Sequence, residues 1–184
     1  NKPYFKISLR TPVVSAFKTP SNNKFKYTIT DPKSLFAIAC LKFNHIGINH
    51  WWMEDPPSAD WINFNGEYVQ TNHRRTVNQD PYASEADRKL MVDGWFVRSM
   101  PDLNQDNEFV ANYLIQNSIW WVEYAGLDGI RMDTYPYSNQ DFMQRWVKRM
   151  KLEYPDFTIL GETWLQKEAI TAYYAASENE RFGY

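Results

Sequence analysis

Gly126-Leu127-Asp128-Gly129-Ile130-Arg131-Met132-Asp133 is typical of a short buried strand that ends in a carboxylate. Side chains two apart on a strand point to the same face, so Arg131 and Asp133 should project together. Ile130 and Met132 should point the other way, into an apolar layer. A guanidinium beside a carboxylate favours the ionised carboxylate. The stretch therefore predicts either a preformed reactive anion or a structural ion pair, and taken alone it does not decide between them.

Composition limits the class of protein. The chain has 184 residues, of which 43% are hydrophobic and 23% are charged, as in ordinary globular domains. The net charge of −2 provides no general attraction to nucleic acid or to anionic membranes. Apolar runs stay below the ~20 residues that span a bilayer. Aromatic residues make up 17% of the chain, which suits either a sugar-binding site or an aromatic core.

Strand and helix patterns alternate through the second half of the chain. A helical pattern runs to Gly126, with Asn104 or Asp106 as its expected N-cap. A second helix should begin at Ser138, by a box-like cap, and stop at Pro155. A second buried strand follows at 157–160. This order predicts βαβ units, a parallel sheet and an α/β fold.

The first half of the chain is less regular. Ser34–Phe43 is apolar and fits either a helix or a buried strand. Residues 46–100 are rich in Trp, Pro, Asn and Asp, with one helix expected near Ser84–Val92. Long irregular segments inside compact domains are usually functional, so this one is interpreted as an inserted subdomain.

Two successive predicted strands each lead into a carboxylate, Asp133 and Glu162. In parallel α/β folds the carboxyl ends of the strands share one face, which carries the active site. Retaining glycosidases use two carboxylates ~5–5.5 Å apart, one ionised and one protonated. Arg131 favours the ionised role for Asp133. Glu162 has no cation next to it in sequence, and the residues just before it are apolar. This setting favours the protonated form of Glu162, which a general acid needs.

Four motifs resemble those of the α-amylase family of glycoside hydrolases, in the neopullulanase and cyclomaltodextrinase branch. Gly129–Asp133 is similar to the nucleophile motif and Leu160–Trp164 to the acid/base motif. Asn44-His45 resembles the end of the first motif, and Met100–Asn104 the block that leads out of the inserted domain B. The resemblance implies an internal fragment of a retaining hydrolase of α-1,4-glucosidic bonds in starch-derived oligosaccharides or pullulan.

The resemblance also implies a domain plan, namely a partial TIM (β/α)8 barrel, about strands 3 to 5, with an irregular inserted domain B. Residues 39–45 would form barrel strand 3, residues 46–102 domain B, and residues 103–184 the segment with strands 4 and 5. Residues 1–38 stay unassigned or divergent.

Roles follow by resemblance for six residues. Asp133 would be the nucleophile and Glu162 the general acid and base. Substrate-binding roles fall to the residues that would orient the nucleophile or contact sugars, namely His45, Arg131, Trp164 and Tyr135.

Two departures from the family pattern stand out. Cys40 occupies the position of an aspartate four residues before Asn44, and the third catalytic carboxylate has no counterpart in the chain. They motivate an alternative, a catalytically inactive amylase-like module that binds carbohydrate or a partner. A further alternative is that three barrel strands with open edges do not fold stably alone.

The expected partner is an α-glucan or maltooligosaccharide, with no nucleic acid and no membrane, and a homodimer of the full-length parent stays open. No cofactor is expected. Calcium stays open because Asn44 matches a calcium ligand of some family members, and a loop hydrogen bond is the alternative. The resemblance favours a periplasmic or secreted protein over a cytoplasmic one.

Overall fold

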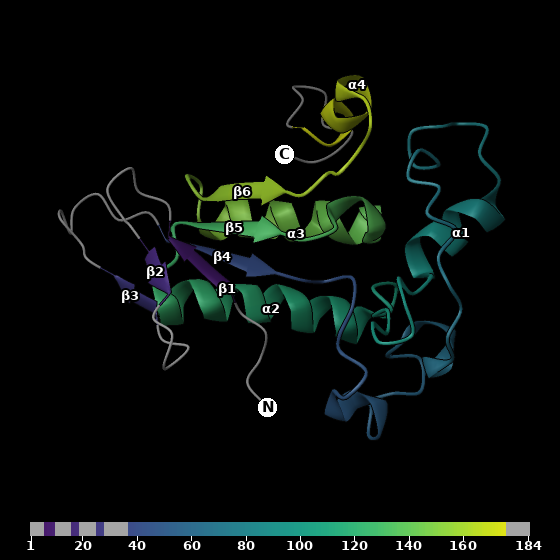
Figure 1. Cartoon of the computed structure of the whole chain (residues 1–184), viewed down its shortest axis with the longest axis horizontal. Coiled ribbons are helices and arrows are strands. Elements are labelled where there is room, and N and C mark those ends of the chain that lie inside the picture. Colours follow the sequence, from purple (N-terminus) through teal and green to yellow (C-terminus); the bar gives the residue numbers. More distant parts are fainter. Residues whose placement is uncertain (1–5, 10–15, 19–24, 28–36, 176–184) are drawn as a thin grey trace.

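A computed structural model of the chain describes residues 6–9, 16–18, 25–27 and 37–175, and its centre is a four-stranded sheet (Figure 1). The sheet has the order β1 (Lys6–Leu9), β4 (Ala37–Leu41), β5 (Gly129–Met132) and β6 (Thr158–Gly161). The last three strands are parallel, whereas β1 pairs antiparallel with β4. Strands β2 (Ala16–Lys18) and β3 (Phe25–Tyr27) form a separate antiparallel pair. The predicted α/β fold with a parallel sheet is confirmed, and the apolar run that precedes Phe43 is a strand.

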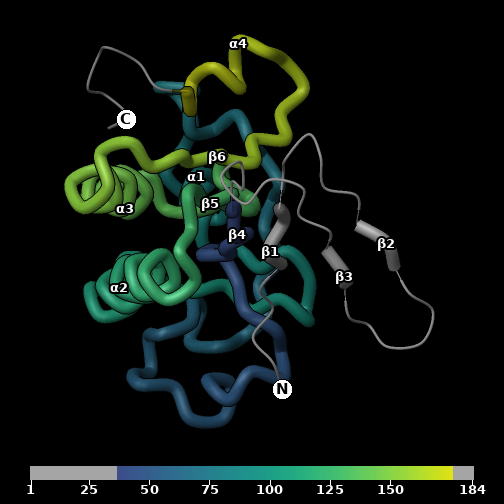
Figure 2. The backbone as a smooth tube through the Cα atoms, turned by 90° about the vertical axis from the view of Figure 1, so that its left-hand side faces the viewer, coloured from purple at the N-terminus to yellow at the C-terminus, as the bar shows by residue number. Residues whose placement is uncertain are grey.

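Two long helices cover one face of this sheet (Figure 2). They are α2 (Glu108–Ala125) between β4 and β5, and α3 (Gln140–Glu153) between β5 and β6. Two short helical segments, α4 (Glu168–Thr171) and η5 (Ala172–Tyr174), follow β6. Each crossover therefore joins neighbouring parallel strands through a helix, as in βαβ units.

Alternating side chains of the strands form the buried layer beneath these helices. Ile130 and Met132 are fully buried, as predicted, beside Leu41 of the neighbouring strand. The helices contribute a face of apolar residues at helical spacing, including Trp146, whose indole Nε1 donates to Ser118 Oγ at 3.1 Å. The sequence pattern correctly identified the buried face of α3, whereas the face expected for α2 is only partly buried, since Tyr113 and Ala125 are exposed.

The helix starts differ from the predicted ones. Asn107 caps α2 by accepting from two backbone N–H groups, and Asn104 instead accepts from Asp106 N in the turn before the helix. Asn139 caps α3 through Phe142 N at 2.9 Å. Ser138 is buried, and its hydroxyl has no hydrogen-bond partner within the described part of the chain. Each cap was misplaced because neighbouring polar residues compete for the same role.

The second predicted buried strand is less buried than expected. Phe157 is buried, but the residues of β6 are half-buried or exposed, and Leu160 is 47% exposed. The reason is topological, since β6 is an edge strand in the described sheet and its second face carries no helix. This second face is the one onto which Arg131 projects.

The segment between β4 and α2, residues 46–102, is called the insertion below. It contains the short helical turns η2 (Trp51–Met53) and η3 (Asn63–Gly66) and the helix α1 (Glu85–Asp93), which Ser84 caps. Its two ends are joined by backbone pairing, with Ile46 N donating to Pro101 O and Leu103 N to Asn44 O. The expected irregular segment with one helix is therefore present.

A buried carboxyl group fixes the base of the insertion. Asp102 is 1% exposed and accepts from Asn44 Nδ2 at 2.5 Å and from Asn63 Nδ2 at 2.8 Å. Burial raises the pKa of Asp102 well above its usual range, against the lowering effect of the two amides.

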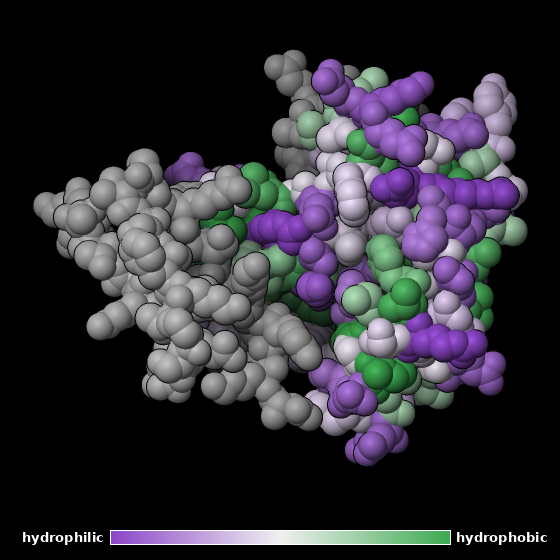
Figure 3. Space-filling model, in the orientation of Figure 1, coloured by the Kyte–Doolittle hydropathy of each residue, from purple (hydrophilic) through white to green (hydrophobic). Residues whose placement is uncertain are grey.

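In the orientation of Figure 3 hydrophilic and hydrophobic patches alternate over the insertion. Across the described residues, no helix is both long and apolar enough to cross a membrane.

Candidate functional site

Three charged side chains follow directly on the ends of the parallel strands. Leu41, Met132 and Gly161 are aligned across β4, β5 and β6. The residues that follow them are Lys42, Asp133 and Glu162. Backbone bonds continue the alignment, since Asp133 N donates to Leu41 O and Glu162 N donates to Met132 O. The register therefore brings the two predicted carboxylates to neighbouring positions at the carboxyl edge of the sheet.

One guanidinium holds both carboxylates. Arg131 Nη1 lies 2.7 Å from Asp133 Oδ1, and Arg131 Nη2 lies 2.5 Å from Glu162 Oε1. The same Nη1 donates to Cys40 Sγ at 2.8 Å from the neighbouring strand. Arg131 and Asp133 thus project together as predicted, and the thiol at position 40 does contact the arginine.

Two cations contact the carboxylate of Asp133. Its side chain is 15% exposed, and Lys42 Nζ lies 3.3 Å from its second oxygen. Burial raises the pKa of Asp133, but the hydrogen bond from Arg131 and the charge of Lys42 outweigh it and leave the pKa below its usual value. Asp133 is therefore held as an anion whose oxygens are fixed by two cations.

Glu162 does not have the apolar setting that its sequence neighbours suggested. It is 36% exposed, is paired with Arg131, and accepts at Oε2 from Thr134 N at 3.1 Å. The expectation of a carboxyl group without a cation is wrong because the cation comes from the adjacent strand rather than from neighbours in sequence. Thr134 adopts a left-handed backbone with φ of 51°, which is uncommon for a β-branched residue and directs its N–H toward Glu162.

His45 lies immediately before the insertion, close enough to Asp133 for the charge of that carboxylate to act on it. It is 8% exposed, and its Nδ1 lies 3.0 Å from Asn44 Oδ1. Burial, and then the charge of Lys42, lower the pKa of His45 to about 4, while Asp133 acts in the opposite direction. His45 is therefore a neutral imidazole near neutral pH, with Nε2 free of the Asn44 contact.

The two aromatic candidates for sugar contacts, Trp164 and Tyr135, are placed differently. Trp164 follows β6 by three residues and is 81% exposed. Tyr135 is buried, and its ring contacts the backbone of Gly161 so closely that a Cβ there would lie 3.0 Å from it. Tyr137 is also buried and contacts Phe96 of the insertion. Tyr135 is therefore buried, with its ring filling the space beside β6.

The side chain of Asn44 takes part in two hydrogen bonds. Its side-chain oxygen faces His45, and its amide nitrogen donates to the buried carboxyl of Asp102. No group of three or more His, Cys, Asp or Glu side chains in the described residues is arranged to hold a metal ion. Asn44 thus links His45 to the buried carboxyl of Asp102 through its side-chain amide.

Two site residues were missed at the level of sequence. Lys42 was identifiable in principle, because it is two residues from Cys40 on the same strand face, next to the strand of Asp133. Thr134 offered no signal, since its role depends on an unusual backbone conformation.

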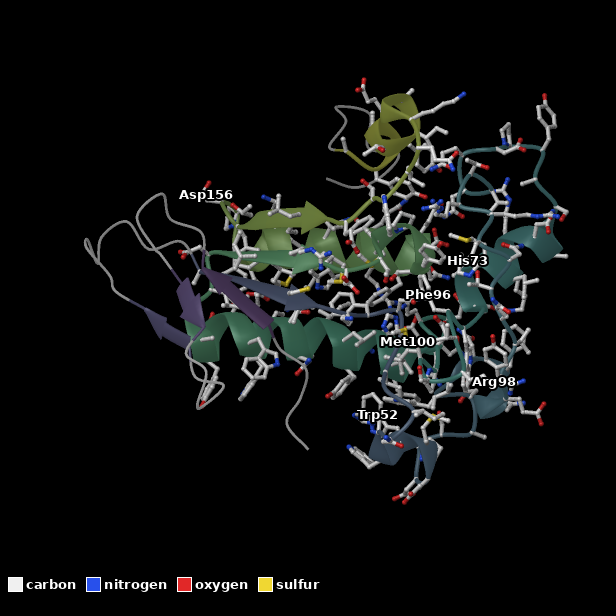
Figure 4. The ribbon with its side chains drawn as sticks, viewed as in Figure 1. Trp52, His73, Phe96, Arg98, Met100 and Asp156 are labelled. Carbon is white, nitrogen blue, oxygen red and sulfur yellow. The ribbon has the colours of Figure 1, made fainter. Side chains whose placement is uncertain are left out.

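Figure 4 shows His73 and Phe96 of the insertion beyond the carboxyl ends of the strands, whereas Asp156 lies at the opposite end of β6. The ring centroid of Phe96 lies 5.7 Å from that of His45 and 5.6 Å from that of His73.

Known proteins with similar sequences are glycan-processing enzymes. A cyclomaltodextrinase from Geobacillus thermopakistaniensis is 26% identical over 175 residues, which cover 80% of this chain and 27% of that protein. The intracellular maltogenic amylase of Bacillus subtilis is 28% identical over 179 residues, covering 86% of this chain and 28% of that protein. The chain therefore spans little more than a quarter of the length of these curated relatives.

Structure and family comparisons agree. The α-amylase from Geobacillus thermoleovorans, solved in complex with acarbose, superimposes with a TM-score of 0.60 and 30% identity, over 78% of this chain and 28% of that one. The family model "Alpha amylase, catalytic domain" matches residues 33–182. The catalytic domain of this family is a TIM barrel, of which the described chain forms a three-stranded parallel part with its helices. The chain belongs to the α-amylase family of glycosidases.

Proposed function

We propose that this chain provides the nucleophile and the general acid of a retaining glycosidase that cleaves α-1,4-glucosidic bonds in starch-derived oligosaccharides or pullulan. The observation that carries the proposal is that Arg131 contacts both Asp133 and Glu162 at the ends of neighbouring strands. Carboxylates that share one guanidinium lie side by side, as the short separation in retaining enzymes requires. The relatives named cyclomaltodextrinase and maltogenic amylase support the substrate class.

In the proposed reaction Asp133 attacks the anomeric carbon with a carboxylate electron pair. The glycosidic C–O bond breaks, its electrons pass to the leaving oxygen, and Glu162 donates a proton to that oxygen. Water then attacks the covalent glycosyl-enzyme while Glu162 accepts a proton from it, which releases Asp133 and the sugar. Glu162 is half-exposed, so a substrate that enters the site can reach its carboxyl group. In its protonated form Glu162 can then contact the substrate in place of Arg131.

His45 and Trp164 are proposed to bind the sugar. A neutral imidazole can hydrogen-bond a hydroxyl group through Nε2, because Nδ1 already faces Asn44. The exposed indole of Trp164 offers a flat apolar face to the C–H side of a neighbouring glucose. Both residues lie on segments that leave the carboxyl edge of the sheet.

We also propose the domain plan that the motifs suggest. Residues 39–45 correspond to barrel strand 3, the insertion to domain B, and residues 103–184 to the part with strands 4 and 5. In this plan the third catalytic carboxylate comes from barrel strands outside the present sequence.

The test is hydrolysis of maltoheptaose and pullulan by the full-length protein and its Asp133→Asn and Glu162→Gln variants. Both near-isosteric changes should reduce kcat by several orders of magnitude, as removal of a nucleophile or an acid does. Asp156→Asn is the matched control, because this exposed carboxylate lies at the far end of β6. Unchanged activity of Asp133→Asn would refute the nucleophile assignment.

A second candidate function is carbohydrate binding without turnover, favoured by one observation. Cys40 contacts Arg131 where the family pattern has an aspartate, so the guanidinium is held by one carboxylate fewer. Calorimetry with maltoheptaose, run beside the hydrolysis assay, separates the two functions. Heat of binding with no released sugar would favour the binding module, and turnover would exclude it.

A further inference from the structure

The insertion contacts the loops that follow both β5 and β6. Arg75 Nη1 donates to the backbone oxygen of Trp164 at 2.6 Å. Asn78 is buried, and its Nδ2 donates to Pro136 O at 3.0 Å and to Tyr174 Oη at 3.1 Å. A short segment of the insertion therefore touches the loop after each catalytic strand.

Two further contacts tighten the same contact region. Tyr173 Oη donates to Asn78 O at 2.8 Å, so Asn78 is joined to the segment after β6 through both its side chain and its backbone. His73 Nδ1 lies 3.2 Å from Tyr137 Oη in the loop after β5. His73, Arg75 and Asn78 are together called the clasp below, because they link the two loops from the side of the insertion.

The backbone on either side of Glu162 is fixed from opposite directions. Strand β5 and the loop after it hold Glu162 itself, since Glu162 N donates to Met132 O and Glu162 O accepts from Tyr135 N. Two residues later the chain leaves the sheet, and there Trp164 O accepts from Arg75. The segment 162–164 is thus held between the sheet and the clasp.

We propose that the clasp is a positioning element for the general acid, in which Arg75 and Asn78 fix the loop after β6 and thereby orient Glu162 and Trp164. Arg75 does not touch the carboxylates in this arrangement and acts through the loop backbone. The effect of the clasp on catalysis rests on the proposed function, in which Glu162 is the general acid. The contacts that fix the loop do not depend on that function.

The chain offers a matched pair of variants for the test. Arg75→Gln removes the charged donor to Trp164 O. Arg74→Gln makes the same change of charge at the neighbouring residue, whose partner is Asp87 within the insertion at 2.6 Å. Arg75→Lys keeps a cation, whose single nitrogen can still donate a hydrogen bond to the same oxygen. The first measurement is hydrogen exchange of the full-length protein, followed by mass spectrometry of peptides that cover residues 162–175.

Arg75→Gln should speed exchange in 162–175 by roughly tenfold or more, the change expected from losing a charged hydrogen bond. Arg74→Gln should leave this segment unchanged, and Arg75→Lys should lie between the two. Equal exchange in Arg75→Gln and Arg74→Gln would overturn the proposal, whether or not the protein hydrolyses glucans.

Kinetics then test the catalytic consequence. Misplacing an acid reduces the rate of chemistry more than it reduces binding, so Arg75→Gln should lower kcat roughly five- to tenfold with a smaller change in KM. Partial recovery in Arg75→Lys is expected. Faster exchange with unchanged kcat would refute the positioning role. Faster exchange in a protein that hydrolyses no glucan would refute the proposed function, and the clasp would then only hold the loop in place.

Discussion

His45 should remain neutral until the pH falls to about 4, and this changes the stability of the protein in a calculable way. The folded-state pKa of His45 lies below the ordinary histidine pKa of 6.5, so between these two values the unfolded chain binds a proton that the folded chain does not. The contribution of His45 to stability is therefore complete above pH 6.5 and is lost as the pH falls. The difference corresponds to about 3 kcal/mol of unfolding free energy by pH 4.

The direct assay is a proton NMR titration of the three histidine rings, with His45→Gln used to assign the signal of interest. The His45 signal should stay unshifted down to about pH 5 and move near pH 4. A His45 pKa at or above 6.5 would refute the reasoning about burial and about the charge of Lys42.

Urea unfolding at several pH values gives the matching free energy. Wild type should lose about 3 kcal/mol more than His45→Gln between pH 7.5 and pH 4, because the variant has no imidazole to protonate. The buried carboxyl of Asp102 contributes with the opposite sign, since its raised pKa favours the folded state at low pH. Asp102 contributes equally in wild type and in His45→Gln, so the difference between the two proteins reports on His45 alone. If the unfolding free energies of the two proteins changed in parallel with pH, the expected contribution of His45 would be contradicted.

Three further predictions concern single contacts. Lys42→Met should move the acid limb of the pH–rate profile to higher pH by less than one unit, because a half-exposed ion pair with Asp133 contributes only ~0.2–1 kcal/mol; an unchanged limb would exclude this role. Trp146→Ala should lower the free energy of unfolding by roughly 3–5 kcal/mol in urea titrations, since the indole is fully buried and donates to Ser118. Asn107→Ala should cost about 1 kcal/mol in the same assay if this residue caps α2, and no loss would return the cap to an earlier residue.

The parts of the fold that depend on local pattern could be predicted from the sequence. Period-two burial at Ile130 and Met132, and the helical faces that pack on them, require only neighbours along the chain. The strand ends and their carboxylates were predicted for the same reason. The exact caps at Asn107 and Asn139 were not, because several adjacent polar side chains can serve and tertiary contacts choose among them.

The electrostatic setting of the site depended on register, which local pattern does not supply. Arg131 was assigned to Asp133 alone, whereas it also binds Glu162, one strand away. Lys42 and Cys40 entered the site for the same reason, since each lies opposite its partner only once β4 and β5 are aligned. The insertion's contacts with the loops after β5 and β6 join residues about 60 to 95 positions apart in sequence, for which no local pattern exists.

The central claim is that Asp133 forms the covalent bond to the sugar. Incubating the full-length protein with a fluorinated α-glucosyl fluoride, which forms the glycosyl-enzyme faster than water removes it, would trap this species for peptide mass spectrometry. One added sugar is expected on the peptide that carries Asp133, and none in Asp133→Asn. A label on any other residue, or turnover of glucans by Asp133→Asn at the wild-type rate, would contradict it.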